Sequence, residues 1–308
     1  MAKRGIAVAP WTDESLEASI EQAGAAVVDA GGADGFIWLN PMDPPALIDV
    51  LKTSPARWVQ LPVAGIESFF AAGAIDPQRT WTCAKGIYGH ACAEHALALM
   101  LAAARRIHHH SRNRAWEAEV FGRPERRLKG KTIVVFGTGG IGTELVPMVN
   151  PLGASVIGVN RSGRPLEGAD RTVTSDRFRV EAADADFVVL AAAVTEETKG
   201  VVDADFLGNM KSDAWIVNVA RGILVDTGAL VVALKDNKIG GAALDVTEPE
   251  PLPEDHALWS LDNTIITPHV ANTWDMGVPD LRELIGRNIE KFVRGEKLEA
   301  LVDVDAGY

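Results

Sequence analysis

The sequence predicts an α/β fold with parallel sheets, and three observations favour that class. Short apolar runs of strand length alternate with helix-like stretches along most of the 308 residues. One apolar run, residues 132–136, leads directly into a glycine-rich turn and then into a helix-like stretch, which is the order of a βα unit. A chain of this length can bury more than one hydrophobic core, so we expect two domains.

The first part of the chain predicts a sheet with helices on its faces. The helix-like stretches are residues 14–23 and 46–51. The expected strands are 6–9, 26–28, 36–39, 58–61 and 81–84. A long helix rich in Ala and Leu follows at about 90–107, and the basic, polar stretch after it predicts a projecting arm at about 108–129.

A second series of strands and helices begins at Thr132. After the strand 132–136, the expected strands are 155–159, 187–191, 215–219, 242–246 and 264–266, and an amphipathic helix follows at about 276–294. Pro147 falls inside the helix expected after the glycine-rich turn, where it removes a hydrogen bond and clashes with the preceding turn. We therefore expect a kink or a short helix there.

The glycine-rich turn has the sequence Gly-Thr-Gly-Gly-Ile-Gly and predicts a dinucleotide-binding loop. Gly137 permits the tight turn, Gly139 lets the backbone approach a pyrophosphate, and Gly142 lets helix and strand pack closely. The free N–H groups at the start of the helix then face the anion. A plain surface turn is the alternative, which the position between a strand and a helix disfavours. The candidate cofactor contacts are Gly137, Thr138, Gly139, Gly140, Ile141 and Gly142.

The end of the next strand predicts which dinucleotide binds. NAD sites carry an acidic residue about 20 positions past the glycines, where it bonds the ribose hydroxyls. A guanidinium can bind the 2′-phosphate of NADP bidentately, whereas a carboxylate would repel it. This strand ends without an acid, in Asn160, Arg161, Ser162, Gly163 and Arg164. We therefore expect NADP(H) as the preferred cofactor and NAD(H) as the alternative, with Arg161 as the main anchor beside Asn160, Ser162 and Arg164.

The composition disfavours several classes of partner. The 30 basic and 42 acidic residues give a formal net charge of −12, which argues against nucleic acid and anionic membranes and means that an anionic substrate needs local positive charge. No apolar run is long enough to span a membrane, and the N-terminal segment lacks the pattern of a signal peptide. Two cysteines give no disulfide framework, so we expect a cytoplasmic protein.

Three polar residues stand where strands of the second series end. Arg221 follows one strand, Glu250 lies between two prolines, and His269 follows the last strand. Ligands of doubly wound sheets bind outside the carboxyl ends of the strands, so all three are expected to face the same crevice as the glycine-rich turn. A lone His or Arg in such a position is more often an ordinary loop residue, but the three together predict an acid–base apparatus.

These motifs, in this order and spacing, resemble the D-isomer-specific 2-hydroxyacid dehydrogenases. Besides the glycine-rich turn, they are Asn-x-x-Arg-Gly at 218–222, Asp-Val-x-x-x-Glu-Pro at 245–251 and Thr-Pro-His at 267–269. The resemblance implies a Rossmann cofactor domain with a doubly wound parallel sheet, residues 91–281, inserted into a flavodoxin-like substrate domain, residues 1–90 plus 282–308. It also implies a homodimer, with the stretch at about 108–129 as a dimerisation arm.

The resemblance further implies roles for single residues. Arg221 would bind the substrate carboxylate and polarise the C2 carbonyl, and protonated His269 would give its proton to the ketone oxygen as hydride arrives at C2. Glu250 would accept a hydrogen bond from the other ring nitrogen, and its charge would orient the imidazole and favour the protonated ring. Asp245 and Ala220 would contact the cofactor, Asp245 at the nicotinamide carboxamide.

The first domain has its own candidate segment, Val-Ala-Gly-Ile-Glu at 63–67, which resembles the family's substrate loop. The backbone N–H groups of Ala64 and Gly65 would bind the substrate carboxylate. Without the resemblance, Gly65 is equally an ordinary turn glycine. Glu67 stands where many relatives have Asp.

Other residues have less specific patterns. The three successive histidines at 108–110 would point in different directions on a helix, so we expect no shared metal ion. His90 and His95 lie on the long helix, where packing or hydrogen bonding between domains is the expected role. Trp38 and Trp274 are candidates for the substrate pocket or for ordinary core packing.

The resulting prediction is an oxidoreductase that transfers hydride from NADPH to a small anionic 2-keto acid, giving the D-2-hydroxy acid. Glyoxylate and hydroxypyruvate are the first candidates, by analogy with NADP-preferring relatives, because motifs fix the reaction and not the side group. Another 2-hydroxy acid, D-lactate-like or bulkier, is the first alternative. A dinucleotide-sensing scaffold of the corepressor branch is the second, and steady turnover of any 2-keto acid would separate it from an enzyme.

Overall fold

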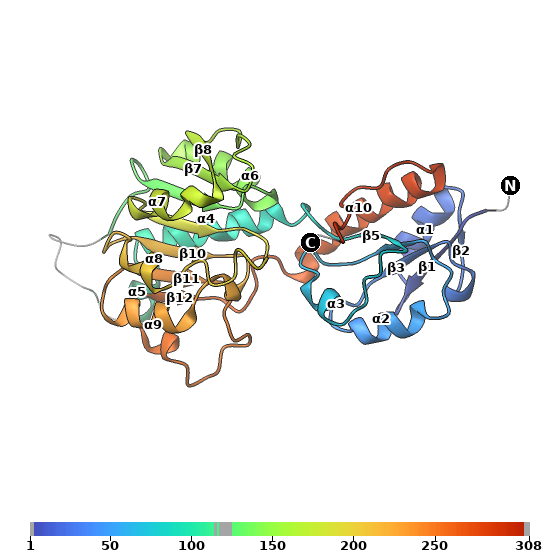
Figure 1. Ribbon diagram of the computed structural model, residues 1–308, viewed down its shortest axis with the longest axis horizontal. Helices are drawn as coiled ribbons and strands as arrows, with labels where there is room; N and C mark the ends of the chain where they lie inside the picture. Colours follow the sequence, from blue (N-terminus) through green and yellow to red (C-terminus); the bar gives the residue numbers. More distant parts are fainter. Residues whose placement is uncertain (1–2, 114–115, 117–124, 305–308) are drawn as a thin grey trace. The chain divides into compact units, whose positions relative to one another are not determined.

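The computed structural model describes residues 3–113, 116 and 125–304, and the chain divides into two compact units (Figure 1). The first unit is Met1–Tyr88 together with Trp274–Tyr308, and the second is Gly89–Thr273. The sequence predicts boundaries after residues 90 and 281. The second boundary lies earlier than predicted, because the last helix begins at Trp274 and belongs to the first unit over its whole length.

The first unit contains a five-stranded parallel sheet with the strand order β2-β1-β3-β4-β5. Its strands are β1 (Gly5–Ala9), β2 (Ala26–Val27), β3 (Gly35–Trp38), β4 (Trp58–Gln60) and β5 (Thr80–Thr82). Its helices are α1 (Glu14–Gln22), α2 (Pro44–Leu51), α3 (Glu67–Ala71) and α10 (Trp274–Arg294). The order is flavodoxin-like, and every predicted strand is present with ends shifted by only one or two residues.

Apolar side chains fill both faces of this sheet, as its near-continuous apolar strands predict. Helices α2 and α3 pack on one face, where Leu47 and Phe69 are fully buried, and α1 and α10 pack on the other. Asp13 and Asp43 cap the starts of α1 and α2. Their carboxylates accept hydrogen bonds at 3.1 and 3.0 Å from the backbone N–H groups three residues on, which fixes where each helix begins.

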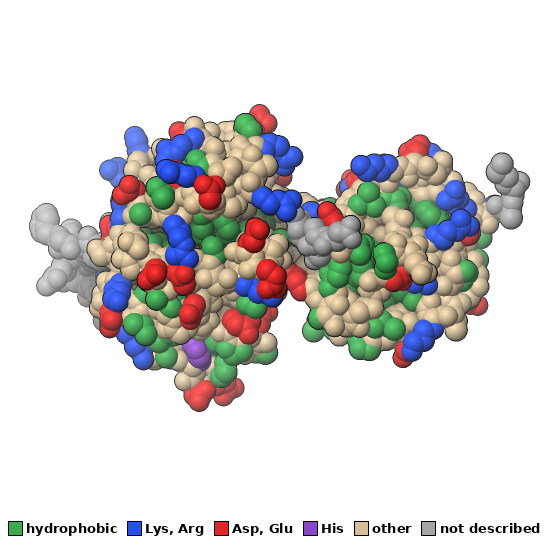
Figure 2. All heavy atoms as spheres, in the orientation of Figure 1, with side chains coloured by type: hydrophobic (Ala, Val, Ile, Leu, Met, Phe, Trp, Pro, Cys, Tyr) green, Lys and Arg blue, Asp and Glu red, His purple; other side chains and the backbone are tan. Residues whose placement is uncertain are grey.

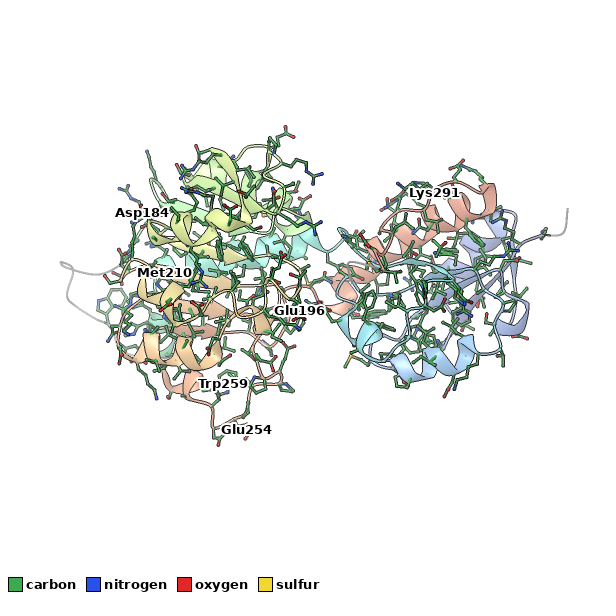
Figure 3. All side chains as sticks on the ribbon, in the orientation of Figure 1. Asp184, Glu196, Met210, Glu254, Trp259 and Lys291 are labelled. Atoms are coloured by element: carbon green, nitrogen blue, oxygen red, sulfur yellow. The ribbon has the colours of Figure 1, made fainter. Side chains whose placement is uncertain are left out.

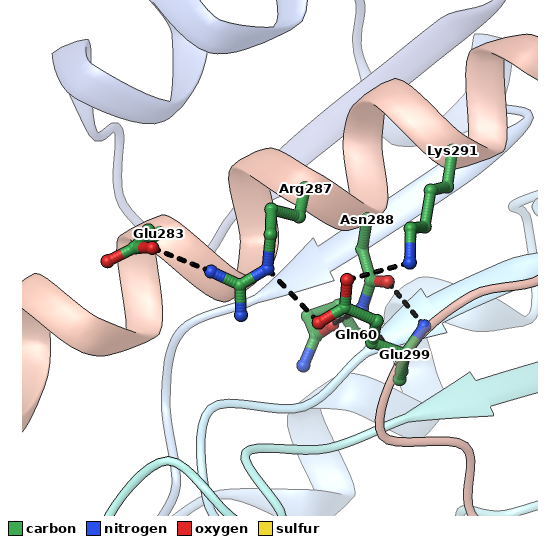
Figure 4. A network of polar contacts seen from close by, with 6 residues as sticks. All are labelled: Gln60, Glu283, Arg287, Asn288, Lys291 and Glu299. Atoms are coloured by element: carbon green, nitrogen blue, oxygen red, sulfur yellow. Dashed lines mark hydrogen bonds and ion pairs between the residues drawn. The ribbon is translucent and has the colours of Figure 1, made fainter.

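A buried polar network attaches α10 to the sheet of the first unit (Figure 4). The side chain of Asn288 is fully buried, donates to Gln60 Oε1 at 3.1 Å and accepts from the backbone N–H of Glu299 at 2.8 Å. Arg287 and Lys291 pair with the Glu299 carboxylate at 3.1 and 2.7 Å. The bonds of Asn288 therefore fix both the helix and the segment that follows it, since a buried amide without partners is costly.

The second unit contains a seven-stranded parallel sheet with the order β12-β11-β10-β9-β6-β7-β8. Its strands are β6 (Thr132–Phe136), β7 (Ser155–Asn160), β8 (Arg171–Thr174), β9 (Phe187–Leu190), β10 (Trp215–Asn218), β11 (Gly241–Leu244) and β12 (Thr264–Ile266). Its helices are α4 (Gly89–Ala104), α5 (Ile107–Arg112), α6 (Gly140–Val149), α7 (Phe178–Ala183), α8 (Ala204–Gly208) and α9 (Thr227–Lys235). Strand β6 lies between β7 and β9, so the order reverses there, as in a Rossmann sheet.

Helices cover both faces of this sheet over separate apolar cores. Helices α4 and α6 pack on one face, and α7, α8 and α9 pack on the other. Helices α4 and α6 meet closely at their starts, because a Cβ on Gly89 would lie 2.7 Å from the backbone of Gly140. Glycine at position 89 therefore brings the long helix directly against the helix that follows the glycine-rich turn.

Some details depart from the sequence prediction. The long helix α4 ends at Ala104 rather than near 107, because Arg106 adopts a left-handed backbone conformation (φ 50°) and α5 starts after it. Helix α6 includes Pro147 and ends two residues later. Strand β8 was not predicted, since its four residues are short of buried apolar side chains. Of the predicted arm, residues 114, 115 and 117–124 lie outside the described residues.

Four further observations concern the surface and the reactive side chains. Within the described residues, no helix combines the length and the apolar character needed to cross a bilayer. The same part of the chain holds no group of three or more His, Cys, Asp or Glu side chains arranged for a metal ion. Cys83 and Cys92 are free thiols. On the face shown in Figure 2, Lys and Arg side chains lie among Asp and Glu side chains on both units.

Candidate functional site

The candidates of the second unit lie at one edge of the seven-stranded sheet. The glycine-rich turn follows β6 and Asn160 ends β7, while the Arg221, Asp245 and His269 segments follow β10, β11 and β12. The carboxyl ends of parallel strands share one edge, which is where ligands of such sheets bind. The fold therefore gathers side chains that are more than a hundred positions apart in the sequence.

The glycine-rich turn has the geometry that each of its glycines predicts. Gly137 has φ 103°, and a Cβ there would lie 2.4 Å from the carbonyl oxygen of Ala191. A Cβ on Gly142 would lie 2.6 Å from the carbonyl oxygen of Gly137, so helix and turn are in close contact. A Cβ on Gly139 would meet nothing within 4 Å, which leaves open space beside the backbone where α6 begins.

The loop after β7 is bonded to the glycine-rich turn through Asn160. Asn160 Nδ2 donates to Thr138 Oγ1 and to the carbonyl oxygen of Arg164, both at 2.8 Å, and its Oδ1 accepts from the backbone N–H of Ser162 at 3.1 Å. The side chains of Arg161 and Arg164 are exposed, and among the described residues neither guanidinium has a carboxylate partner. Asn160 thus brings two predicted cofactor segments together and leaves two cations unpaired beside them.

The Arg221 loop is shaped by its neighbours Asn218 and Gly222. Asn218 is fully buried at the end of β10; its side chain accepts from the backbone N–H of Ala220 at 3.1 Å and donates to the carbonyl oxygen of Arg221 at 2.8 Å. A Cβ on Gly222 would lie 2.0 Å from the carbonyl group of Thr247. The loop therefore packs backbone to backbone against the segment that carries Glu250, which only glycine at position 222 allows.

Hydrogen bonds hold the Glu-Pro-Glu-Pro segment in place. Thr247 Oγ1 donates to the carbonyl oxygen of Pro249 at 2.8 Å, and Thr227 Oγ1 donates to that of Glu248 at 2.7 Å. Farther along, Trp259 Nε1 donates to the carbonyl oxygen of Pro253 at 2.9 Å, which closes the excursion between β11 and β12 where Figure 3 labels Trp259 and Glu254.

His269 and Glu250 form a direct pair. His269 Nδ1 lies 2.6 Å from Glu250 Oε1, and the two side chains are 49% and 42% exposed, so solvent or a ligand reaches both. Because Nδ1 faces the carboxylate, Nε2 points away from it and is available to a ligand. His269 has φ 54°, a left-handed conformation that non-glycine residues adopt only when their surroundings hold them there.

Asp245 holds the segment around His269 in place through hydrogen bonds. Its side chain is 1% exposed, and its Oδ1 accepts from Thr267 Oγ1 at 2.6 Å and from the backbone N–H of Val270 at 2.9 Å. Its Oδ2 accepts from the backbone N–H of Ala271 at 2.9 Å. Burial raises the pKa of this carboxyl, but the hydrogen bonds, including one from His95, outweigh burial and lower its pKa to about 2. An ionised Asp245 therefore holds the loop on both sides of His269.

Electrostatic effects also connect Arg221 with this group. Burial raises the pKa of the Cys92 thiol to about 11; the Asp245 charge raises it further, and the Arg221 charge lowers it. Cys92 thus lies within range of both charges, and the thiol stays protonated near neutral pH.

The predicted substrate loop lies in the first unit and is described by itself. It follows β4, and the carbonyl oxygen of Val63 accepts from the backbone N–H of Ala84 at 2.9 Å. Ala64 is exposed and Gly65 partly exposed. Neither of their backbone N–H groups donates to an acceptor within the described part of the chain. Two free donors in succession suit an anionic ligand.

Sequence reasoning missed three residues of this site. Asn218 and Thr267 stood inside the quoted motifs without a role, yet their side chains close the two loops that carry Arg221 and His269. His95 was expected to pack or to bond between domains, but it bonds within its own unit, to Thr267 and Asp245. The available signal for the first two was that each is the polar residue that begins its motif.

Together these groups can perform proton transfer beside a bound anion. An imidazole paired with a carboxylate can act as a general acid or base, and a neighbouring guanidinium can bind a carboxylate. The glycine-rich turn and the start of α6 fit a dinucleotide pyrophosphate, since Gly139 leaves open space beside the free N–H groups.

Comparisons with known proteins agree with this arrangement. The family model described as "D-isomer specific 2-hydroxyacid dehydrogenase, NAD binding domain" matches residues 97–271. The chain is 42% identical over 307 residues, 97% of this chain and 98% of the relative, to a Corynebacterium melassecola protein named "Uncharacterized protein in proB 3'region". The chain is also 33% identical over 226 residues to a glyoxylate reductase of Thermofilum pendens. This match covers 71% of this chain and 66% of that enzyme, which is just under two thirds of the enzyme's length.

A solved structure shares the fold over the full length. The D-isomer specific 2-hydroxyacid dehydrogenase from Xanthobacter autotrophicus Py2, in complex with NADPH and MES, matches with a TM-score of 0.83 at 24% identity, covering 100% of both chains. The predicted fold class, with its Rossmann-type cofactor domain, is confirmed.

Proposed function

Because the chain belongs to the D-isomer specific 2-hydroxyacid dehydrogenase family, we propose that it is an NADPH-dependent reductase of a small 2-keto acid, giving the D-2-hydroxy acid. The observation that carries the proposal is the 2.6 Å contact between His269 Nδ1 and Glu250 Oε1. The Arg221 loop, which packs through Gly222 against the Glu250 segment, supports it.

The reaction needs one hydride and one proton, and the protein residues account for the proton. When bound, NADPH supplies the hydride that adds to C2 of the keto acid. His269, protonated, donates a proton from Nε2 to the ketone oxygen, and in the oxidative direction it takes the proton back. Glu250 orients the ring and favours its charged form. Arg221 binds the substrate carboxylate and polarises the carbonyl.

The loop after β7 supports the preference for NADPH over NADH. Arg161 carries an exposed guanidinium with no carboxylate partner among the described residues, and no acid at the end of β7 repels a 2′-phosphate. Asn160, Ser162 and Arg164 supply further donors in the same loop. We assign the 2′-phosphate to Arg161, with Arg164 as a weaker contact.

The remaining cofactor contacts follow the motifs. The pyrophosphate would lie against the glycine-rich turn, Gly137, Thr138, Gly139, Gly140, Ile141 and Gly142. Ala220 would contact the cofactor from the Arg221 loop. For Asp245 we assign the contact with the nicotinamide carboxamide to Oδ2. Within the described residues this oxygen accepts one hydrogen bond, from Ala271, so it can accept another.

The substrate side of the proposal rests on the first unit and on relatives. In the first unit, the backbone N–H groups of Ala64 and Gly65, which have no acceptor within the described residues, would bind the substrate carboxylate. The match to a glyoxylate reductase favours a small side group, so glyoxylate and hydroxypyruvate remain the first candidates. D-lactate-like or bulkier acids are the alternative. We further propose a homodimer, with residues of about 108–129 as the arm.

The experiment that tests the function is NADPH oxidation by the purified protein against a panel of 2-keto acids of increasing side-group size. We expect turnover of the small acids, weaker turnover with NADH, and a loss of about a thousandfold in kcat for His269→Ala with little change in NADPH affinity. Binding of NADPH without turnover of any acid would instead favour the dinucleotide-sensing scaffold. Undiminished turnover by His269→Ala would remove His269 from the mechanism.

A further inference from the structure

We propose that His95, on helix α4, is a positioning residue for the reaction, because it bonds the Asp245–Thr267 pair that fixes the loop carrying His269. His95 Nε2 lies 3.0 Å from Thr267 Oγ1 and 3.3 Å from Asp245 Oδ1. Its side chain is 20% exposed, and it lies 172 positions before Thr267 in the sequence but in the same unit. The assignment rests on the proposed function for the reaction that is positioned.

The donors and acceptors in this group determine where the protons lie. The Thr267 hydroxyl has one proton, and the 2.6 Å contact assigns that proton to the ionised Asp245 Oδ1. Thr267 Oγ1 can then only accept from His95, so we assign a proton to His95 Nε2. His95 therefore supplies a donor that a purely apolar side chain of similar size could not replace.

The group reaches His269 through its backbone. Asp245 accepts from the backbone N–H groups of Val270 and Ala271, and its own carbonyl oxygen accepts from the backbone N–H of His269 at 2.8 Å. His269 itself is in the left-handed conformation, which is strained for a non-glycine residue and persists only where neighbours hold it. A shift of Thr267 or Asp245 would therefore move the imidazole.

His95 contacts the loop that carries His269 from a helix and not from the sheet. Asp245 and Thr267 both follow strand ends of the sheet edge, so their mutual bond alone does not attach the loop to the helix layer. Helix α4 is anchored along its length by buried residues such as Ala93, Ala96 and Met100. Through His95, this helix holds the loop from the side.

The test compares His95→Leu, His95→Gln and the matched control His90→Leu on the same helix. His90 has a 69% exposed side chain, and its one partner among the described residues is Glu144, at 3.1 Å. For His95→Leu we expect kcat to fall about tenfold or more, with the KM for NADPH within about twofold and a larger primary isotope effect with deuterated NADPH. Gln can place an amide donor near the position of Nε2 and should recover most of kcat, and His90→Leu should match the wild type.

A second measurement does not depend on turnover. Hydrogen exchange of the backbone amides over residues 267–273 should become faster in His95→Leu and stay slow in His95→Gln and His90→Leu, because the amides of Val270 and Ala271 are held by Asp245. Thr267→Val, which removes the hydroxyl, should add little to His95→Leu in the double variant.

The outcomes separate the two proposals. A wild-type protein without turnover of any 2-keto acid would count against the proposed function and leave the exchange result to decide the positioning role. Unchanged exchange over 267–273 in His95→Leu, or equal loss of kcat in His95→Leu and His95→Gln, would overturn the role assigned to His95.

Discussion

At the scale of single residues, Gly222 is the position where the Arg221 loop and the Glu250 segment approach most closely. Its α-hydrogen faces the Thr247 carbonyl group so closely that a Cβ would lie 2.0 Å from it. Gly222→Ala must therefore displace the Arg221 loop or the Glu250 segment. We expect kcat/KM to fall about a hundredfold, since small misplacements of catalytic groups have effects of that size.

The control for Gly222→Ala is Gly208→Ala, at the end of α8. A Cβ at Gly208 would meet nothing within 4 Å, so this variant should keep full activity and stability. Steady-state kinetics of the two variants, with a thermal unfolding curve for each, makes the comparison. Equal kinetics would mean that the two backbones separate without effect on the reaction.

Arg161 tests the cofactor preference with a single charge. Arg161→Asp replaces an exposed guanidinium with a carboxylate directly after β7. A charged hydrogen bond contributes about 1.5–3 kcal/mol, so the Kd for NADPH should rise about tenfold or more, whereas the Kd for NADH should change little or fall. Fluorescence titration with both dinucleotides gives the two constants. Parallel losses for both would show that Arg161 does not contact the 2′-phosphate.

Asp245 makes the stability of the second unit depend on pH. Its pKa in the folded protein is about 2, below the ordinary 3.8, because its hydrogen bonds outweigh burial. A lowered pKa contributes stability that is full above the unfolded value and is lost as the pH falls through the folded one. The shift corresponds to about 2 kcal/mol, lost between about pH 4 and pH 2.

The side chain at position 245 cannot titrate in Asp245→Asn. Between about pH 4 and pH 2, the free energy of unfolding should therefore decrease in both proteins, but by about 2 kcal/mol less in the variant than in the wild type. Denaturant titrations at several pH values give the free energy of unfolding of each protein as a function of pH. The slopes of the two curves are compared, and not their absolute values, because Asn also changes the hydrogen bonds at every pH. Other acidic groups titrate alike in both proteins. Parallel curves would show that Asp245 is not held ionised by the fold.

At the scale of elements, the attachment of α10 depends more on a buried amide than on its surface ion pairs. Asn288→Leu leaves the partly buried backbone N–H of Glu299 without its 2.8 Å acceptor. We expect a loss of about 1–3 kcal/mol in the free energy of unfolding. Arg287→Gln, which removes a 42% exposed partner of Glu299, should cost less than about 1 kcal/mol. Denaturant unfolding of both variants decides, and a reversed ranking would contradict the account.

Elements with strong local signals could be predicted from the sequence. The strands were found within one or two residues because apolar runs between turn residues are a local signal. The end of α4 could not be found, because the left-handed conformation of Arg106 has no marker such as glycine. Strand β8 pairs only with β7 and has no fully buried side chain, so its pattern is weak.

The site could be predicted where motifs carried it and not where tertiary contacts did. Arg221, Glu250 and His269 stood in motifs whose spacing is set by strand ends, and the structure brings Glu250 and His269 together. The bond from His95 to Thr267 joins residues 172 positions apart. No local pattern in either segment specifies that contact, because it depends on which helix packs over which strand end.

At the scale of the whole molecule, the chain consists of two units with separate cores, and each unit contains one free thiol. Cys83 belongs to the first unit and Cys92 to the second. Burial raises the pKa of both thiols, that of Cys92 to about 11; Cys83 is buried and Cys92 is partly buried, so both react slowly in the folded state. Thiol labelling under native conditions therefore reports opening of each unit separately.

NADPH is assigned to the second unit, and a ligand stabilises only the state that binds it, by about 2.7 kcal/mol at a hundred times its Kd. Each single variant leaves one thiol to be labelled. In Cys92→Ser the remaining thiol is Cys83, in the first unit, and saturating NADPH should leave its labelling rate unchanged. In Cys83→Ser the remaining thiol is Cys92, in the second unit, and NADPH should slow its labelling about a hundredfold. Labelling with a thiol-reactive chromophore at several denaturant concentrations gives both rates, and NADH at equal concentration controls for nonspecific effects. If NADPH slowed the labelling of both thiols equally, the two units would open together as one cooperative body. Binding to the second unit would then also stabilise the first.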